Sequence, residues 1–220
     1  MLRRADIAAV IFDMDGLVLD TEKTYREAWR EAGRAMSHDF PDAFLEALSG
    51  LSMDAVLRTI ESFCGSGFDP REFNRRSAAC WRDYVAVHGV EVKVGFHSLR
   101  EYLDQEGIPF CLATNSASAN AEECLQLAGL AGVFPTVIAR DHVERGKPAP
   151  DIFLQAAAVL NVPIRRCMAL EDSPAGIEAA ASAGAVPVMV PSALPVDAET
   201  LTRCRCVLND LDELLEVIRG

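Results

Sequence analysis

The sequence predicts an α/β protein with a mostly parallel β-sheet and an all-helical segment inserted after the first strand. Two observations support this prediction. Short apolar runs alternate with helical patterns in the 220-residue chain, which is typical of a parallel sheet covered by helices on both faces. Residues from about 20 to 90 interrupt that alternation, because they show helical periodicity and no convincing strand pattern.

The first strand is predicted at residues 7–12, an apolar run that is too short to span a membrane. It is followed by Asp13, Asp15 and Gly16. Residues i and i+2 of an extended chain project to the same side, so we expect the two carboxylates to lie close together. Close carboxylates repel each other unless a cation or proton lies between them, which indicates a site for a hard divalent cation. Gly16 relieves backbone crowding behind them.

The helical segment begins at Asp20 or Thr21, either of which can cap a helix. Apolar residues then recur at helical spacing up to about residue 87. We therefore predict a helical cap domain at 20–90 and a core domain made of 1–19 and 91–220.

The remainder of the chain alternates strands with helices, beginning with a helix at 96–103. Strands are predicted at 108–113, 133–139 (interrupted by Pro135), 167–170, 186–190 and 206–208, and helices at 117–128, 152–160 and 176–183. Polar residues follow the strands that end at residues 113 and 170. Ligands of parallel sheets bind beyond the carboxyl ends of the strands, so we expect the site there.

Composition limits the classes of partner. The formal net charge of −12 argues against nucleic acid and against an anionic membrane surface. An acidic protein can still bind a small phosphorylated metabolite where a metal and a few local donors reverse the field in one cleft. Seven scattered cysteines, with no Cys-x-x-Cys pair and no secretory leader, predict reduced thiols and a cytoplasmic location. We expect a monomer or a weak dimer.

Four polar motifs follow one another at the predicted element boundaries. They are Asp13-x-Asp15-Gly16, Thr114-Asn115-Ser116, Gly146-Lys147-Pro148 and Glu171-Asp172-Ser173-Pro174-Ala175-Gly176. Together they resemble the haloacid dehalogenase-like (HAD) hydrolase superfamily, in the branch that carries a helical cap and includes β-phosphoglucomutase and small-metabolite phosphatases. The resemblance covers nearly the whole chain. It implies a Rossmann-like core, Mg²⁺ as cofactor and an aspartyl-phosphate intermediate.

The first motif would carry the covalent chemistry. A carboxylate can attack phosphorus and form an acyl phosphate, so Asp13 would be the nucleophile. Asp15 would protonate the leaving oxygen and then activate water. The resemblance implies that Asp15 offers only its backbone carbonyl to the metal, and an aspartate here favours phosphate over halide chemistry. Asp13 could instead be a metal ligand only. Chance also produces this pattern, as at 210–212, which we interpret as the start of a solvated helix.

The second and third motifs would bind phosphate. Thr114 would hold a phosphate oxygen through its hydroxyl, and Asn115 and Ser116 would offer backbone N–H groups at a helix start, where anions bind readily. A plain helix cap is the alternative interpretation. Lys147 would neutralise the phosphate and nucleophile oxygens during transfer, although a lone lysine in a loop is usually solvated.

The fourth motif would complete the metal site. Asp172 would be a direct ligand of Mg²⁺, together with Asp13 and the Asp15 carbonyl. We expect Glu171 just outside this shell, where it orients a water, and direct ligation by Glu171 stays open. Asp172 or Ser173 could alternatively cap the following helix.

The resemblance also implies that the cap selects the substrate. β-Phosphoglucomutase carries a histidine in its first cap helix and an arginine after a Gly-x-Ser motif. This chain has Tyr25 at the first position and Met53 after Gly50-Leu51-Ser52 at the second. Both departures favour a phosphatase over a phosphosugar mutase, and we expect Tyr25 and Met53 to line a less charged pocket. A non-catalytic phosphate-binding module is the third alternative. Sugar phosphates, phosphoglycolate and nucleotide monophosphates all stay open as substrates.

Overall fold

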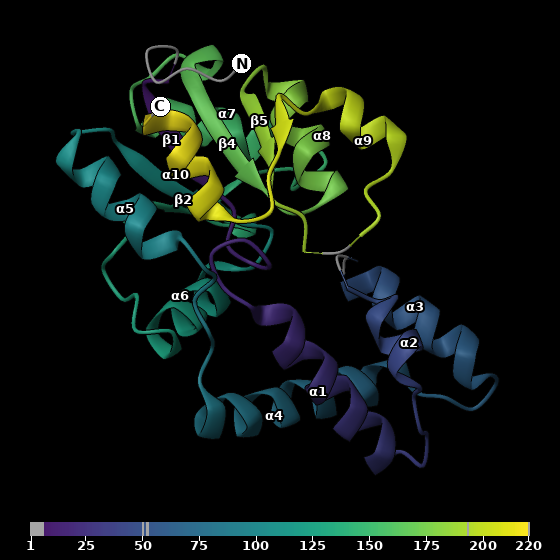
Figure 1. Ribbon diagram of the computed structural model, residues 1–220. Coiled ribbons are helices and arrows are strands. Elements are labelled where there is room, and N and C mark those ends of the chain that lie inside the picture. The colour runs from purple at the N-terminus through teal and green to yellow at the C-terminus, as the bar shows by residue number, and fades with distance from the viewer. Residues whose placement is uncertain (1–6, 50, 52, 193, 220) are drawn as a thin grey trace. The chain divides into compact units, whose positions relative to one another are not determined.

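The computed structural model describes residues 7–49, 51, 53–192 and 194–219. The chain forms two compact units, which we call the sheet unit (Met1–Leu19 with Glu91–Gly220) and the helical unit (Asp20–Val90). Figure 1 shows their elements. Two residues of the predicted cap motif, Gly50 and Ser52, lie outside the described residues.

The sheet unit contains a six-stranded parallel sheet in the order β3-β2-β1-β4-β5-β6. The strands are β1 (Ala9–Phe12), β2 (Phe110–Ala113), β3 (Val137–Ile138), β4 (Cys167–Glu171), β5 (Val186–Met189) and β6 (Cys206–Val207). Every residue of β1, β2 and β4 is buried, which explains why these strands read as continuous apolar runs. The predicted α/β class with a parallel sheet is confirmed.

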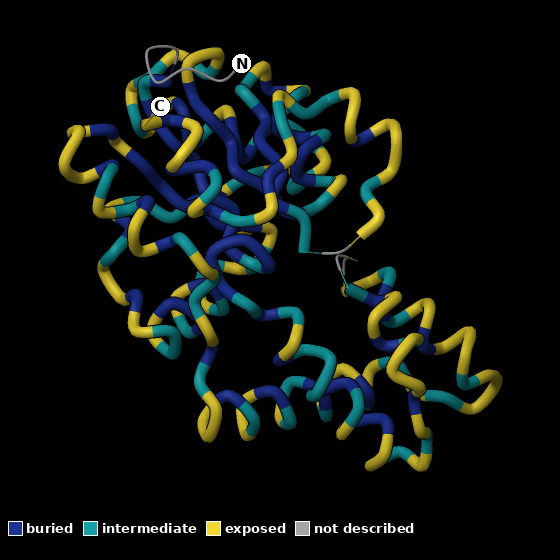
Figure 2. The backbone as a smooth tube through the Cα atoms, viewed as in Figure 1, coloured by how far each residue is buried: buried dark blue, intermediate teal, exposed yellow. Residues whose placement is uncertain are grey.

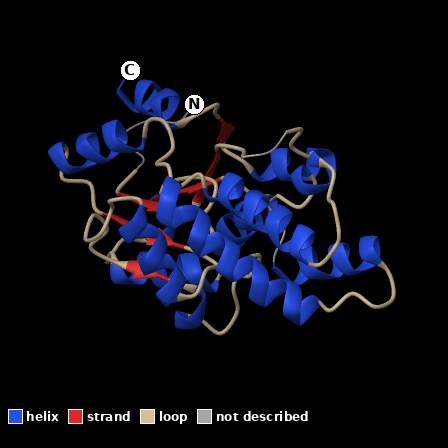
Figure 3. Ribbon diagram, turned by 90° about the horizontal axis from the view of Figure 1, so that it is seen from below, coloured by secondary structure: helices blue, strands red, loops and turns tan. Residues whose placement is uncertain are grey.

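Helices cover both faces of this sheet (Figures 1 and 3). They are α5 (Phe96–Gln105), α6 (Ser118–Leu127), α7 (Asp151–Val159), α8 (Pro174–Ala183), α9 (Ala198–Arg203) and α10 (Leu211–Arg219), with 3₁₀ turns η2 (Arg140–His142) and η3 (Ile164–Arg166). On one face, Ile11 and Ala169 pack against α7 and α8. On the other, the Phe12 ring meets Phe96 of α5 at a centroid distance of 5.7 Å. Successive strand residues therefore fill two separate cores.

The third strand is shorter than the sequence predicted. The prediction of strand at 133–134 is wrong, because these residues form a turn and β3 is limited to Val137–Ile138. Pro135 lies between the two segments and has no N–H to donate to a strand ladder. The apolar character of Phe134 has a different cause, since its ring packs 5.9 Å from that of Phe12 in the aromatic core.

The helical unit has its own apolar core. Its helices are α1 (Thr21–Ala35), α2 (Asp42–Glu46), α3 (Met53–Cys64) and α4 (Pro70–His88), and its described residues include no strand. Phe40, Phe73 and Trp29 belong to a buried cluster. Trp81 Nε1 donates to Thr24 Oγ1 at 3.0 Å and links α4 to α1.

Figure 2 shows buried residues along the strands and the inner faces of the helices. Over the described part of the chain, none of the helices has both the length and the apolar character that crossing a bilayer requires.

Candidate active site

The sheet topology brings the ends of three strands together. β1 is hydrogen-bonded to β2 on one side and to β4 on the other, all in parallel. Asp13, Thr114 and Glu171 therefore lie at one edge of the sheet, where strand ends commonly form ligand sites. The Asp13 N–H donates to Leu170 O at 3.0 Å, so the nucleophile candidate is anchored by the ladder itself.

The ammonium group of Lys147 is buried at this edge. Its Nζ contacts Asp13 Oδ1, lies 2.5 Å from Glu171 Oε1 and donates to Ala113 O at 2.8 Å. Only 4% of the Lys147 side chain is exposed. Its Nζ also lies 5.3 Å from the centre of the Phe153 ring on α7. Lys147 is therefore part of the polar cluster, in contrast to a solvated loop lysine.

Burial and charge determine the protonation of this pair. Burial raises the pKa of Asp13 well above its usual value; Lys147 lowers it, and the carboxylates of Glu171, Asp172 and Asp15 raise it again. Burial lowers the pKa of Lys147, but the Asp13 and Glu171 carboxylates outweigh that effect and hold the pKa above its usual value. These directions favour the charged form of Lys147, and further positive charge beside Asp13 would favour its ionised form.

The acidic residues fit a hard divalent cation. Asp13, Glu171 and Asp172 are all buried, and each offers an oxygen that lies within 4.8 Å of the others. Within the described part of the chain, Asp15 is a further acidic neighbour of Asp13, and Lys147 is the cation that contacts Asp13 and Glu171, so acidic groups outnumber basic ones at this edge. Carboxylate oxygens are the ligands that Mg²⁺ and Ca²⁺ prefer, and no histidine or cysteine belongs to this described cluster.

Gly16 allows Asp172 to approach the end of β1. Its φ is +84°, a conformation that glycine adopts without steric cost. A Cβ built on Gly16 would overlap the Asp172 carboxylate. Both observations explain the glycine at this position, because a side chain would displace a member of the acidic cluster.

The first turn of α8 closes over Glu171. Ser173 Oγ donates to Glu171 Oε2 at 3.2 Å and accepts from the Gly176 N–H at 3.2 Å, so Ser173 is the residue that caps α8. A Cβ on Gly176 would overlap the Glu171 carboxyl group. Glu171 is fully buried and belongs to the same cluster as Asp13 and Asp172. This position is compatible with both expected roles of Glu171, orientation of a water or direct ligation of the metal.

Asp15 is held by hydroxyl groups from the loop after β2. Its Oδ2 accepts from Ser116 Oγ at 2.8 Å and from Thr114 Oγ1 at 3.3 Å. Its Oδ1 is buried without a hydrogen-bond partner among the described residues. The Ser116 N–H, which the sequence suggested for phosphate, donates to Thr114 Oγ1 at 3.0 Å. These contacts bring three predicted site residues together and orient the Asp15 carboxylate.

Asn115 has a contact that the sequence did not suggest. Its side chain forms two hydrogen bonds with the backbone of Lys147, one as acceptor and one as donor. The two residues are separated by 32 positions, and the bonds join a side chain to a distant peptide group. Local spacing carries no signal for such a pair.

The two predicted substrate-selecting residues belong to the helical unit. The Tyr25 ring is stacked between Trp29 and Trp81, with centroid distances of 6.0 and 5.9 Å. Met53 begins α3 and is 40% exposed. Tyr25 is therefore fixed by aromatic neighbours, whereas Met53 is free to meet solvent or a ligand.

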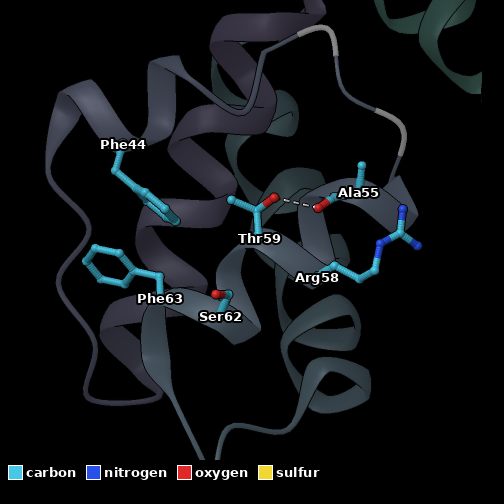
Figure 4. Close-up of a pocket in the computed structure, with 6 residues that line it drawn as sticks. All are labelled: Phe44, Ala55, Arg58, Thr59, Ser62 and Phe63. Carbon is cyan, nitrogen blue, oxygen red and sulfur yellow. Dashed lines mark hydrogen bonds between the residues drawn. The ribbon is translucent and has the colours of Figure 1, made fainter.

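The helical unit also has a shallow hollow of about 490 Å³ that the sequence did not suggest (Figure 4). The rings of Phe44 and Phe63 lie 4.3 Å apart on one side of it, and Arg58 lies on another. Thr59 Oγ1 donates to Ala55 O at 2.8 Å, so this hydroxyl already has a partner. None of the predicted site residues lines this hollow.

Known proteins are similar to this chain in sequence and in fold. The model of the haloacid dehalogenase-like hydrolases matches residues 7–184. A fructose-1-phosphate phosphatase of Escherichia coli is 35% identical over 80% of this chain and 93% of its own length. The β-phosphoglucomutase of Bacillus subtilis is 33% identical over 86% of this chain and 85% of its own. The structure of a HAD hydrolase of family IA, variant 3, from Entamoeba histolytica matches with a TM-score of 0.79 at 27% identity, covering 97% of this chain and 100% of that one. This chain therefore belongs to the haloacid dehalogenase-like hydrolase family.

Proposed function

We propose that this protein is a Mg²⁺-dependent phosphatase that hydrolyses a small phosphorylated metabolite through an aspartyl phosphate on Asp13. The observation that carries the proposal is the buried contact of Lys147 with Asp13 and Glu171 beside an acidic cluster. A nucleophilic carboxylate, a fixed cation and hard-metal ligands are the parts that phosphoryl transfer requires. The phosphatase named among the relatives supports the same reaction.

Asp13 and Asp172, with the backbone carbonyl of Asp15, would hold the metal, and Glu171 is placed to serve as a further ligand or to orient a water. The buried oxygens of Asp13, Glu171 and Asp172 support this assignment. When bound, the cation supplies positive charge that favours ionised Asp13 and stabilises the phosphate oxygens. Lys147 would place a further positive charge beside the same nucleophile.

In the first step, an Asp13 oxygen forms a bond to phosphorus while the bond from phosphorus to the leaving oxygen breaks. Protonated Asp15 transfers its proton to that oxygen. In the second step, ionised Asp15 takes a proton from water, and the water oxygen attacks phosphorus. The Asp13–phosphorus bond then breaks, which restores both carboxyl groups and releases phosphate. The Thr114 and Ser116 hydroxyls support this role by orienting Asp15.

The same hydroxyl groups would bind the transferred phosphate. Thr114 and Ser116 donate to Asp15 in the present structure, and rotation of a hydroxyl about its C–O bond redirects it to a phosphate oxygen without moving the backbone. Lys147 would stabilise negative charge on the nucleophile and on the equatorial oxygens. We assign phosphate binding to these three side chains together with the loop backbone at Asn115.

We propose that the helical unit acts as the cap that selects the leaving group, with Tyr25 and Met53 among its contacts. A sugar phosphate is the substrate class best supported, because one similar protein is a fructose-1-phosphate phosphatase. A reducing compartment is consistent with the seven cysteines, which all lie within the described residues and are free thiols.

The test is a panel of phosphate esters assayed for released phosphate. It includes fructose 1-phosphate, other sugar phosphates, phosphoglycolate and nucleotide monophosphates. We expect release with Mg²⁺, loss of release in excess chelator and recovery when Mg²⁺ is restored. Excess Ca²⁺ should inhibit, because its longer bonds and higher coordination number misplace the nucleophile. Full activity in chelator would refute metal dependence, and binding of phosphate without turnover would indicate a non-catalytic module.

A phosphosugar mutase is the second candidate, supported by the similarity to the Bacillus subtilis β-phosphoglucomutase. The tyrosine and methionine at the two cap positions argue against it. A mutase returns a sugar phosphate with its phosphate moved and depends on a bisphosphate. Release of inorganic phosphate without that requirement separates the two activities.

A further inference from the structure

We propose that Asn115 is a positioning residue that places the ammonium of Lys147 against Asp13. This inference rests on the proposed function for its kinetic consequence, although the geometry stands by itself. The Asn115 Oδ1 accepts from the Lys147 N–H at 2.8 Å, and the Asn115 Nδ2 donates to the Lys147 O at 3.1 Å. One side chain thus binds both polar groups of one residue's backbone, as a neighbouring strand would.

The close approach of this side chain requires the glycine before Lys147. A Cβ added to Gly146 would lie 2.5 Å from Asn115 Oδ1 and 2.5 Å from Arg140 Cδ. Such distances force neighbours to shift. Gly146 has a negative φ, so the reason for glycine at this position is the contact with Asn115 and Arg140, and not the backbone conformation.

The loop that carries Lys147 has a second, separate attachment. The Arg140 N–H donates to Ser116 O at 3.0 Å, and Asp141 accepts from the Ser118 N–H and hydroxyl at 2.8 and 2.6 Å. These bonds join the same two segments several residues before Lys147. Among the residues that the structure describes, only Asn115 forms hydrogen bonds with the peptide groups of Lys147 itself. Asp141 therefore offers a matched control for general loop attachment.

The position of the Lys147 backbone determines whether its ammonium can contact three oxygen atoms at the same time. Nζ reaches Asp13 Oδ1, Glu171 Oε1 and Ala113 O at once, and the side chain that connects it to the backbone is almost completely buried. A flexible stem of four carbons does not define one arrangement by itself. Bonds at both peptide groups restrict that freedom before substrate binds. Misplacement of a catalytic group by about 1 Å can cost about a hundredfold in rate.

The kinetic test compares two alanine variants. Asn115→Ala should lower kcat by about tenfold to a hundredfold and change KM less, because charge on the nucleophile matters most in the transition state. Asn115 is exposed, so its replacement leaves no core cavity. Asp141→Ala should keep kcat within about threefold of the wild type. Equal losses in both variants would overturn the proposal in favour of general loop attachment.

A second measurement does not depend on activity. The chain has three lysines, and acylation of each by an amine-reactive ester is quantified by mass spectrometry. Asn115→Ala should raise the labelling rate of Lys147 several-fold relative to exposed Lys23, whereas Asp141→Ala should not. Gly146→Ala disturbs the same contact from the opposite side and should act like Asn115→Ala. Unchanged labelling of Lys147 in both Asn115→Ala and Gly146→Ala would overturn the proposal. Increased labelling in a protein that hydrolyses no ester would instead refute the proposed function and leave the positioning role standing.

Discussion

Ion pairs in the sheet unit and in the helical unit have the same chemistry but different surroundings. Lys147 and Asp13 are 4% and 8% exposed, whereas Arg75 and Glu72 of α4 are 67% and 30% exposed. Water and salt screen the second pair, which acts as an i,i+3 contact on a helix surface. The first pair is enclosed with two further carboxylates, and removal of one partner leaves uncompensated charge. The burial of its ion pair therefore distinguishes the candidate active site from the surface of α4, where an ion pair of the same kind is exposed.

The largest expected effect is on catalysis, from Asp13→Asn. Removal of a nucleophile commonly costs several orders of magnitude in rate, so hydrolysis should be abolished while far-ultraviolet circular dichroism stays unchanged. Asp212→Asn is the matched control, because it lies in the other Asp-x-Asp sequence and is exposed. It should retain wild-type kcat. Near-normal turnover by folded Asp13→Asn protein would exclude Asp13 as the nucleophile.

A large effect on stability is expected from Lys147→Met. The metal-free variant should lose roughly 3–5 kcal/mol in the free energy of unfolding, because the buried carboxyl groups of Asp13 and Glu171 lose the cation that they contact. Added Mg²⁺ should recover part of the loss. Denaturant titration with and without Mg²⁺ gives both values. Arg75→Met removes a cation from the exposed pair and should have little effect; similar losses in the two variants would contradict the contrast between the units.

A moderate effect on specificity is expected in the helical unit. Tyr25→Phe keeps the aromatic stack and removes the hydroxyl group, and Met53→Ala shortens an exposed side chain. We expect each to change the ratio of kcat/KM between two phosphate esters by about tenfold. Val87→Ala, at a residue of α4 that is 78% exposed, is the control. If every ester loses the same factor, neither residue contacts the leaving group.

The smallest effect concerns pH and the exposed pair. Hydrogen bonds from Arg75 and then Arg76 lower the pKa of Glu72 to about 2, from an ordinary value of 4.5. A lowered pKa in the folded state means stability that is present above pH 4.5 and lost as pH falls toward 2. Glu72→Gln should therefore differ from the wild type in Tm above pH 4.5 and converge with it in acid. High salt should reduce the difference; a difference that persists at pH 2 would argue against an ionic origin.

The sequence predicted those parts of the site that depend on local pattern and parallel topology. Apolar strands ending in Asp13, Thr114 and Glu171 were enough to expect these residues at one edge, because parallel strands end on the same side. The turn at Phe134 was missed because an aromatic core residue and a strand residue look alike in a short apolar run. The Asn115 contact was missed because a side chain bound to a peptide group 32 residues away has no periodicity.

The insertion point of the helical unit has a consequence for how such proteins diversify. Leu19 pairs with Val92 in an antiparallel bridge, and the Lys93 N–H donates to Val18 O at 2.9 Å. The chain thus leaves and re-enters the sheet unit at adjacent points that already pair like the two strands of a β-hairpin. A short reverse turn could join Leu19 to Val92 as well as a long segment does. Two points of the chain that lie this close together can be linked by inserted segments of different length. One inserted module can therefore be exchanged for another at this junction, while the strands that carry the polar site residues keep their sequence and connections.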